Sequence, residues 1–475
     1  SSDLLLNANL STLSKFDKEH VTPWIRNNGK YKIGTFKNNF DFSNSRWTVD
    51  EKEDLELIRE IFRHFNYESK FTWEEILEFE KNNPKLFSIN KKYRRNEGSL
   101  ISNGEKYWRR AKKVIPGGSM LLSKRSEIYL PGKWPAYFSK TKGCDVWDLD
   151  NNKFVDMSLM GVGTNLLGYS NSRVDAAVKQ TINKGNLSTL NCPEEVLLAE
   201  KLIEMHPWSE MARFARTGGE ANAIAIRIAR AATGKDKVAI CGYHGWHDWY
   251  LSSNLENTKN LNNHLITSLK PNGVPSFLKN TCYPFEYGEY KKFKKIISNK
   301  SIGIIMMEVS RNKSLNTKFI KYVRNIARKK GIILIFDECT SGFRETFGGI
   351  YKKINIQPDL VVLGKALGNG YPITAILGKK EIMNYAKQTF ISSTFWTERL
   401  GPAAALKTLE IMEKLKSWEI ITKTGKYLNK QWLKIANENN LKININGLPS
   451  ISKFEIKSQN FQSYKTYITQ EMLKK

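Results

Sequence analysis

The spacing of hydrophobic residues changes along the chain and predicts where strands alternate with helices. Short, mostly apolar runs at 237–241, 302–309, 332–336 and 360–363 have the length and content of strands buried on both faces. Between two of these runs, the segment 317–331 has helical spacing, with an apolar face of Phe319, Ile320, Val323, Ile326 and Ala327. From about residue 106 onward, this alternation predicts an open, mostly parallel α/β sheet with helices on both faces.

The first ninety-odd residues follow a different pattern. The segments 50–65 and 72–87 have helical spacing, and a polar link at 90–105 follows them. We therefore expect two domains, a small N-terminal segment at 1–95 and a main α/β domain at 96–475. The N-terminal segment is expected to be a partial α/β appendage.

Composition and cysteine content fit a cytoplasmic protein. The 475 residues are 40% hydrophobic and 26% charged, and no apolar stretch reaches the roughly 18 to 20 residues of a membrane helix. The first twenty residues lack the basic and apolar regions of a signal peptide. The five cysteines are odd in number and have no CxxC spacing, which is typical of reduced thiols.

The net charge of +28 has two interpretations. A basic protein can bind nucleic acid or an anionic membrane, and a nucleic-acid binder would show steep salt dependence. A Lys- and Asn-rich chain can also carry its lysines evenly over its surface. The chain has no arginine-rich tract, and the lysine run at 289–300 fits a solvated helix face. We therefore favour the second interpretation and expect neither a nucleic-acid partner nor a membrane.

Chemically active residues follow three of the predicted strands. Ligands of open α/β sheets bind outside the carboxyl ends of the strands. Asp337 follows the strand at 332–336, Lys365 follows the strand at 360–363, and the strand at 237–241 leads into Gly242-Tyr243-His244. A carboxylate, an amine and an aromatic ring are thus expected at one edge of the sheet.

A fourth element, 216–234, begins with Gly218 and Gly219 and has the pattern of a helix whose first N–H groups are free to hold a phosphate. Taken alone, each feature has an ordinary structural explanation: a Gly-Gly turn, a snorkelling lysine, or a helix-capping aspartate. Taken together they favour pyridoxal phosphate. Lys365 would bond to its aldehyde, Asp337 would keep its ring nitrogen protonated, and Tyr243 would stack on the ring.

At these residues the chain resembles the class III pyridoxal-phosphate aminotransferases, and among them glutamate-1-semialdehyde 2,1-aminomutase. The resemblance covers roughly residues 100 to 475, and its motifs occur in the family's order. The matching stretches are 115–120, 143–171, 213–248, 331–344, 358–378 and 392–410. The resemblance implies an α/β transferase of fold type I that works as a homodimer.

By this resemblance, Lys365 and Asp337 are the catalytic residues that hold the cofactor aldehyde and the ring nitrogen. The cofactor phosphate would lie on a group of residues that includes one from the neighbouring subunit: Thr217, Gly218, Gly219 and Thr394. Tyr243 would stack on the ring. His244 belongs to the same motif, and the sequence leaves open whether it touches the cofactor or has a structural role.

Four positions depart from the family pattern. Cys339 replaces the usual valine and would pack beneath the ring without acting as a nucleophile. The phosphate motif is TGGEA in place of the commoner SGTEA, which loses a hydroxyl but keeps the backbone donors. The aminomutase has a substrate-pocket tryptophan at or beside the place of Gly163. Arg125 lies near the place of the family's substrate-binding arginine, although the spacing is imperfect.

The N-terminal segment has a resemblance of its own. The stretches 17–28 and 45–62 resemble the closing segment of the cytidylyltransferases that activate acidic sugars, such as acylneuraminate cytidylyltransferase. The nucleotide-binding front of that family is missing, and Asp50 is a single carboxylate, so we expect no metal site and an inactive segment. At the other end, 451–475 resembles part of the family's small C-terminal domain and indicates a shortened chain.

The sequence thus predicts an aminotransferase that uses a small amine donor and a carbonyl acceptor, with a keto or aldehyde sugar of surface-polysaccharide synthesis as the acceptor. The first alternative is glutamate-1-semialdehyde 2,1-aminomutase of tetrapyrrole synthesis. The second is an inactive, truncated homologue that serves as an interaction module.

Overall fold

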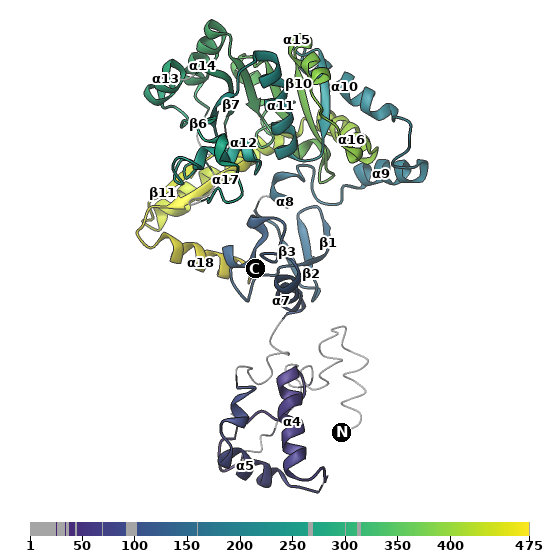
Figure 1. Ribbon diagram of the computed structural model, residues 1–475, viewed down its shortest axis with the longest axis vertical. Helices are drawn as coiled ribbons and strands as arrows, with labels where there is room; N and C mark the ends of the chain where they lie inside the picture. Colours follow the sequence, from purple (N-terminus) through teal and green to yellow (C-terminus); the bar gives the residue numbers. More distant parts are fainter. Residues whose placement is uncertain are drawn as a thin grey trace. The chain divides into compact units, whose positions relative to one another are not determined.

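The structure is a computed structural model that divides into two compact units (Figure 1). The first unit comprises 1–140, 146–154 and 469–475, and the second comprises 141–145 and 155–468. The residues that the structure describes are 25, 34, 38–42, 45–68, 70–91, 102–158, 160–264, 269–299, 301–310 and 315–474.

The second unit is built on a seven-stranded sheet with the strand order β4-β10-β9-β8-β7-β5-β6. Its strands are β4 (Met211–Ala215), β5 (Lys237–Cys241), β6 (Cys282–Pro284), β7 (Ile302–Glu308), β8 (Ile333–Asp337), β9 (Leu360–Leu363) and β10 (Thr374–Gly378). All neighbouring strands are parallel except β10, which runs antiparallel to both β9 and β4. The mostly parallel sheet that the sequence predicts is therefore confirmed.

Helices cover both faces of this sheet. They are α9 (Ser172–Lys184), α10 (Pro193–Met205), α11 (Gly218–Thr233), α12 (Asp248–Leu251), α13 (Tyr290–Asn299), α14 (Thr317–Lys330), α15 (Lys380–Met383) and α16 (Leu400–Leu415). The helix α17 (Ser417–Glu438) leads to a two-stranded sheet of β11 (Ile443–Asn446) and β12 (Lys453–Ile456). The helix α18 (Phe461–Met472) follows.

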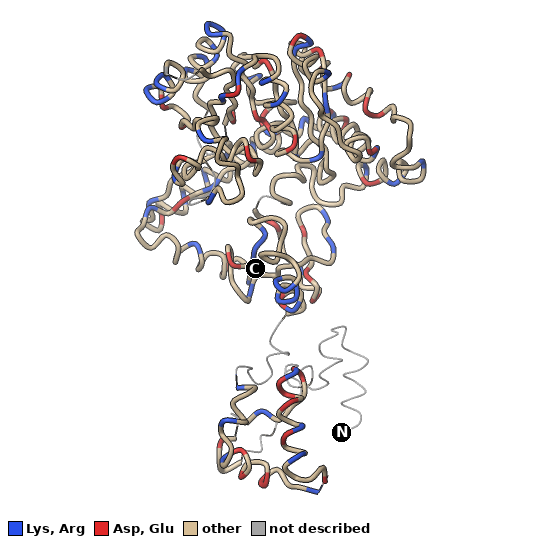
Figure 2. The backbone as a smooth tube through the Cα atoms, in the orientation of Figure 1, with Lys and Arg blue, Asp and Glu red and all other residues tan. Residues whose placement is uncertain are grey.

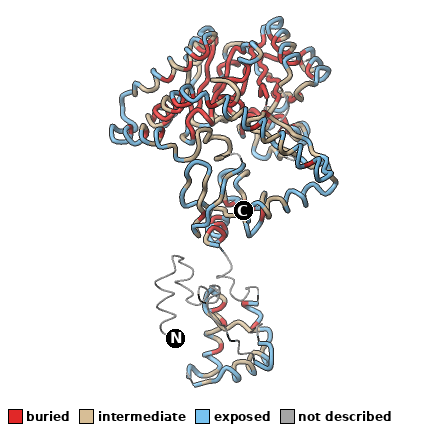
Figure 3. The backbone as a smooth tube through the Cα atoms, turned by 180° about the vertical axis from the view of Figure 1, so that it is seen from behind, coloured by how far each residue is buried: buried red, intermediate tan, exposed pale blue. Residues whose placement is uncertain are grey.

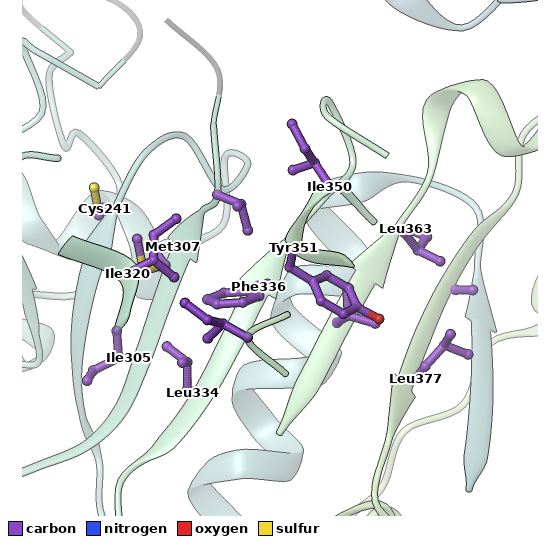
Figure 4. Packing of buried hydrophobic residues seen from close by; sticks show 14 of the residues in the cluster. Cys241, Ile305, Met307, Ile320, Leu334, Phe336, Ile350, Tyr351, Leu363 and Leu377 are labelled. Carbon is purple, nitrogen blue, oxygen red and sulfur yellow. The ribbon is translucent and has the colours of Figure 1, made fainter. Parts of the chain in front are cut away.

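Successive residues of each strand point into different hydrophobic clusters. Ile305 and Met307 of β7 pack on the side of α10, α14 and α16, whereas Ile304 and Met306 pack on the side of α11. Figure 4 shows the first side, with residues of β7, β8, β9 and β10 in one layer. Figure 3 shows buried residues concentrated along the strands. The continuous apolar runs follow from this burial on both faces.

The predicted elements lie close to their observed positions. The predicted runs 237–241 and 360–363 coincide with β5 and β9. The run predicted at 332–336 is displaced by one residue, because the N–H of Ile332 still donates to Ala327 O at 2.9 Å and so belongs to the end of α14. Gly331 ends that helix at φ 62°, the left-handed region that favours glycine. As a result, Asp337 is the last residue of β8 rather than the residue after it.

The N-terminal segment folds as helices in the part that the structure describes. It contains α4 (Lys52–His64), α5 (Trp73–Asn82) and the short helix η1 (Leu86–Ser88), which pack around Leu57, Ile61 and Phe87. The described residues between 45 and 91 contain no strand, so they show only the helical part of the expected appendage. Of the stretch 17–28, only residue 25 is described.

The first unit also holds α7 (Asn103–Val114) and most of a sheet of β1 (Phe138–Lys142), β2 (Asp145–Asp148) and β3 (Lys153–Val155).

Basic residues occur throughout the described chain, with acidic residues between them (Figure 2). In α13, the lysines are exposed while Phe293 and Ile297 are buried, which confirms the solvated helix face predicted at 289–300. None of the described helices has both the length and the apolar character needed to cross a membrane.

A buried carboxylate organises the N-terminal helices. Asp54 is fully buried and accepts hydrogen bonds from Arg46 Nε at 3.0 Å, Arg46 Nη2 at 2.6 Å and Asn90 Nδ2 at 2.9 Å. The backbone N–H groups of Asp50 and Glu51 donate to it as well. Burial raises the pKa of the Asp54 carboxyl, but these hydrogen bonds lower it more, so its pKa is about 2.

We predict that Asp54→Asn destabilises these helices by about 3–5 kcal/mol, because it leaves the Arg46 guanidinium without its buried partner. Hydrogen exchange of the amides in α4 and α5 measures the loss. The exposed neighbour Asp50, which also contacts Arg46, provides the control Asp50→Asn. Because the folded pKa is depressed, the stabilisation is present above the unfolded pKa of about 4 and disappears as the pH falls through about 2. Equal exchange in the two variants would contradict the assignment.

Candidate active site

The sheet register brings the predicted catalytic residues to one edge. Asp337 pairs with Glu308 on one side and with Val362 on the other. Lys365 follows Val362 by three residues, and three residues span at most about 11 Å. Asp337 and Lys365 therefore lie at the carboxyl edge of adjacent strands, as the sequence predicts.

The start of α11 reaches the same edge through β4 and β10. Thr374, the first residue of β10, pairs with Ala215, the last residue of β4. The hydroxyl of Thr374 donates to Thr217 O at 3.4 Å, one residue before the helix begins. The antiparallel β10 thus joins the helix start to the strand that precedes Lys365.

The sulfur of Cys339 packs between the helix start and the lysine loop. A Cβ built on Gly218 would lie 3.3 Å from Cys339 Sγ, and a Cβ built on Gly364 would lie at the same distance. Burial raises the pKa of the Cys339 thiol well above its ordinary value, so the thiol stays protonated at neutral pH. This sulfur therefore fills space and is no nucleophile.

Asp337 is a buried carboxylate that is held by three N–H donors. Its Oδ2 accepts from His244 Nδ1 at 2.8 Å and Asn222 Nδ2 at 2.8 Å, and its Oδ1 accepts from Cys339 N at 3.1 Å. Burial raises the pKa of the Asp337 carboxyl. The hydrogen bond and charge of His244, together with the other donors, lower this pKa by more than burial raises it, so the group is ionised at neutral pH. A carboxylate has about four acceptor positions. Two N–H donors reach its Oδ2 and one reaches its Oδ1, and the Cys339 thiol also interacts with this carboxylate.

The structure places His244 against the carboxylate of Asp337. Its ring is fully buried, and its backbone O accepts from Asn222 Nδ2 at 3.2 Å. Because an ionised carboxylate only accepts, the Nδ1 of His244 carries the proton. The contacts of His244 are thus with the carboxylate of Asp337 and the amide of Asn222.

Lys365 is held in a backbone conformation that is unusual for its side chain. Its φ is 46°, in the left-handed region, and it opens the short helix η7 (Lys365–Gly368). Its Nζ donates to Thr340 Oγ1 at 2.7 Å. Thr340 lies three residues after Asp337, so this contact places the amine beside the strand end that carries the carboxylate.

The predicted phosphate cup consists of the backbone of two glycines at the start of α11. No described residue accepts a hydrogen bond from the N–H of Gly218 or Gly219. The hydroxyl of Thr217 is engaged elsewhere, since it accepts from Glu220 N at 3.4 Å and donates to Glu220 Oε2 at 3.1 Å. The sequence predicts Thr217 as a phosphate ligand, and the structure uses its side chain to cap α11.

Gly163 lies beside Lys365 in a strained segment. In the four-residue element α8 (Met160–Gly163), all four residues have positive φ, including the β-branched Val162 at 61°. A Cβ on Gly163 would lie 2.7 Å from Arg344 Nη2 and 3.9 Å from Lys365 Cδ. The structure therefore leaves no room for a side chain at 163 without movement of Arg344.

Arg344 fixes this segment from within the protein. Its Nη2 donates to Gly163 O at 2.6 Å, and its Nε donates to Thr340 O. Burial lowers the pKa of the guanidinium to about 10, and no described carboxylate pairs with it. Arg344 thus connects the strained backbone at 163 to the threonine that holds Lys365.

The remaining predicted site residues are placed less directly. Tyr243 is half-buried, donates its N–H to Glu308 Oε2 at 3.0 Å and packs edge to face on Tyr250. Thr394 is exposed in the short helix η9 (Thr394–Thr397). Arg125 belongs to the first unit, where its guanidinium packs on the backbone of Gly117. Among the described residues no cluster of three or more potential metal ligands occurs.

Sequence reasoning missed Asn222, Glu308, Thr340 and Arg344. Two of them carry a signal. Asn222 is an amide on the apolar face of a helix rich in Ala and Ile, and Glu308 is an acid that ends an all-apolar strand. A buried polar residue needs hydrogen-bond partners, so each points to a polar site nearby.

An amine, a buried carboxylate and a glycine-led helix start at one edge of a mostly parallel sheet define a pyridoxal-phosphate-dependent transferase of fold type I. The comparisons with known proteins agree. Residues 131–474 match the model of the aminotransferase class-III family, and the chain belongs to that family.

The relatives and the solved structure described next each match about three quarters of this chain. A 3-aminobutyryl-CoA aminotransferase of Cloacimonas acidaminovorans is 34% identical over 76% of this chain and 85% of its own length. A glutamate-1-semialdehyde 2,1-aminomutase of Methanothrix thermoacetophila is 32% identical over 74% and 82%. The FumI protein of Sphingopyxis sp. MTA144, solved in its PLP internal aldimine form, superposes with a TM-score of 0.67 at 24% identity, over 75% of this chain and 84% of that one. This last likeness shows the fold.

The neighbour of Asp337 yields a prediction for stability. Glu338 is fully buried, and its carboxylate accepts from Ser341 Oγ and from Tyr351 N. Burial raises the pKa of the Glu338 carboxyl to about 7. The pKa of Glu338 is higher in the folded protein than in the unfolded chain. The stability that Glu338 contributes is therefore fully present below the unfolded pKa of about 4.5 and is lost as the pH rises through 7.

We predict that the wild type loses up to about 3 kcal/mol of stability from this group between pH 4.5 and pH 8. Glu338→Gln removes that titration while keeping an acceptor for Tyr351 N, so its melting temperature should depend less on pH. Thermal unfolding across this pH range measures the difference, with the exposed Glu204→Gln as the control. If the melting temperatures of the wild type and Glu338→Gln depended on pH in the same way, the prediction would be wrong.

Proposed function

We propose that this chain is an aminotransferase that moves an amino group from a small amine donor to a carbonyl acceptor, with Lys365 and Asp337 as its catalytic residues. The observation that carries the assignment is the carboxylate of Asp337. It is buried and ionised, its Oδ1 accepts from one N–H group of the described residues, and it lies at the edge from which Lys365 projects. Such a carboxylate fits the protonated ring nitrogen of pyridoxal phosphate.

When it is bound, pyridoxal phosphate supplies an electron sink that allows a C–H bond beside an amine to break. Lys365 Nζ takes and returns the proton at the substrate carbon, and the hydroxyl of Thr340 holds the amine in place until it is needed. The carboxylate of Asp337 would favour a positive charge on the ring nitrogen, because its depressed pKa keeps the carboxylate ionised. His244 and Asn222 prevent this carboxylate from rotating.

The other assignments follow the same arrangement. The N–H groups of Gly218 and Gly219 bind the cofactor phosphate, Tyr243 stacks on the ring, and Cys339 lies beneath it. The enzyme works as a homodimer in which Thr394 of the partner subunit completes the phosphate site.

The segment that carries Thr394 supports this dimer. Arg216 Nη2 donates to the carbonyls of Trp396 and Glu398, both at 2.8 Å. Trp396 Nε1 donates to Glu220, the residue that caps α11. The segment is thus anchored at its base, while Thr394 itself is exposed and available to a second subunit. All five cysteines are free thiols, which supports a reducing cytoplasmic location.

For the acceptor we propose a keto or aldehyde sugar, or its small precursor. The resemblance of 17–28 and 45–62 to sugar-activating cytidylyltransferases supports this choice. A relative that is named 2'-deamino-2'-hydroxyneamine transaminase, from Streptomyces kanamyceticus, is 29% identical over 66% of this chain and 76% of its own length. A side chain at Gly163 would collide with Arg344, which disfavours a tryptophan at that position. By the family resemblance, Arg125 is a candidate for substrate binding.

We predict that purified wild-type protein binds pyridoxal phosphate and turns yellow, and that Lys365→Ala loses both the colour and at least about 10³-fold of its amino-transfer rate. The exposed Lys380 lies in the same unit and provides the control Lys380→Ala. Absorbance and half-transamination rates measure the two effects. A mutant that stays yellow would disprove the role of Lys365, and a colourless wild type would favour the inactive homologue.

A second measurement separates the aminotransferase from the aminomutase. An aminotransferase is predicted to stop after about one turnover per site unless an amine donor is supplied, because its amino group comes from another molecule. An aminomutase moves the group within glutamate-1-semialdehyde and continues without a donor. Steady-state turnover of glutamate-1-semialdehyde alone would replace our assignment with the alternative.

A further inference from the structure

The histidine at 247 occupies the place of a side chain that the phosphate cup lacks. Gly219 is the third residue of the TGGEA motif, where the commoner motif has a threonine. A Cβ built on Gly219 would lie 3.0 Å from Cε1 and 3.1 Å from Nδ1 of His247. The imidazole therefore fills the space into which a side chain at 219 would project.

The Nδ1 atom of His247 has no hydrogen-bond partner. It is buried, and no described residue lies within hydrogen-bond geometry of it. A buried polar atom without a partner costs about 1–3 kcal/mol. Such an atom beside two free backbone N–H groups marks a place where a ligand is to bind.

The orientation of the ring is fixed by its own loop. The carbonyl of His247 accepts from Tyr250 N at 3.0 Å and Leu251 N at 3.1 Å, at the start of α12. The ring stacks on Trp246 with centroids 4.5 Å apart. Because the backbone and the ring of His247 are both held, Nδ1 is already in position before a ligand binds.

The charges around His247 leave it neutral in the free protein. Burial lowers the pKa of the imidazole, and the nearby carboxylates of Glu220 and Asp248 raise it by less. The Glu220 carboxylate is already occupied by the N–H groups of Thr217 and Arg216. A neutral imidazole carries one N–H, which can serve as a donor to an anion.

We propose that His247 donates a hydrogen bond from Nδ1 to the cofactor phosphate, in place of the hydroxyl that Gly219 lacks. The donor set of the cup then consists of two backbone N–H groups and one imidazole, and its ligand is a phosphate monoester. This proposal rests on the proposed function, because it requires the phosphate of pyridoxal phosphate at the start of α11.

The test uses cofactor-free protein and two ligands that differ only in the phosphate. Quenching of tryptophan fluorescence gives the dissociation constants of pyridoxal phosphate and of pyridoxal. His247→Ala should weaken pyridoxal phosphate by about 10-fold to 100-fold, as expected for a hydrogen bond to a charged group, and should leave pyridoxal unchanged. His247→Gln keeps an N–H donor and should recover part of the loss. The exposed Asp236→Asn, in the same unit, is the control and should bind both ligands as the wild type does.

A double variant tests the exchange directly. Gly219→Thr alone should weaken pyridoxal phosphate, because its Cβ collides with the imidazole. Combining Gly219→Thr with His247→Ala removes the collision and supplies a hydroxyl, so affinity should rise above that of either single variant.

Two outcomes overturn the proposal while the proposed function stands. His247→Ala can bind pyridoxal phosphate as tightly as the wild type does, or it can lose affinity for pyridoxal by the same factor, which indicates a purely structural role. A wild type that binds neither ligand rejects the proposed function together with this inference.

Discussion

The buried carboxylate of Asp337 is the constraint on which the rest of the site depends. An ionised carboxylate is stable inside a protein only when hydrogen-bond donors surround it. Here the donors come from separate parts of the chain: Asn222 from the interior of α11, His244 from the loop after β5, and the backbone of Cys339. Each donor has to be in place for the charge to be tolerated, so the helix, the loop and the strand end are held relative to one another. The helix that carries Asn222 begins with the glycines of the phosphate cup, and the loop that carries His244 also carries Tyr243. One electrostatic requirement thereby aligns the parts proposed to bind the ring and the phosphate.

The lysine side of the site is held by a different principle. Lys365 and the residues 160–163 have left-handed backbone conformations, which are unfavourable for residues other than glycine and persist only where the surroundings fix them. Arg344 provides much of that fixation, since it bonds to the carbonyls of Gly163 and Thr340 while Thr340 holds the amine. A buried guanidinium without a carboxylate partner is costly by itself. Its cost is reduced by these carbonyl contacts, and in return the backbone beside the reacting amine is kept rigid.

The sequence was sufficient for features that depend on local pattern, and insufficient for those that depend on which segments meet in space. Four strands of the sheet (β5, β7, β8 and β9), the ends of α14 and the lysine and aspartate at the strand ends follow from periodicity, glycine positions and the rule that ligands bind at carboxyl ends. The donors to Asp337 do not, because Asn222 is distant from it in sequence and reaches it only after α11 packs on the sheet. Thr217 illustrates a local competition for a hydrogen-bonding group. Its hydroxyl matches a family motif, but a glutamate three residues later captures it for the helix cap. A motif specifies which groups are present, and local competition decides which of them stays free.

A pair of glycines explains how one loop can serve both ends of the site. A Cβ on Gly245 would lie 2.8 Å from the Cα of Gly219, so the loop after β5 and the start of α11 are in backbone contact. This approach requires glycine at 245 because of its φ of 107°, and it requires a small residue at 219 because His247 lies over it. Contact at this point places His244, one residue before Gly245, against the carboxylate of Asp337. It also places His247, two residues after Gly245, beside the phosphate cup. The glycine at 219 therefore does more than expose a backbone N–H, since the space left by its missing side chain allows the second histidine to approach.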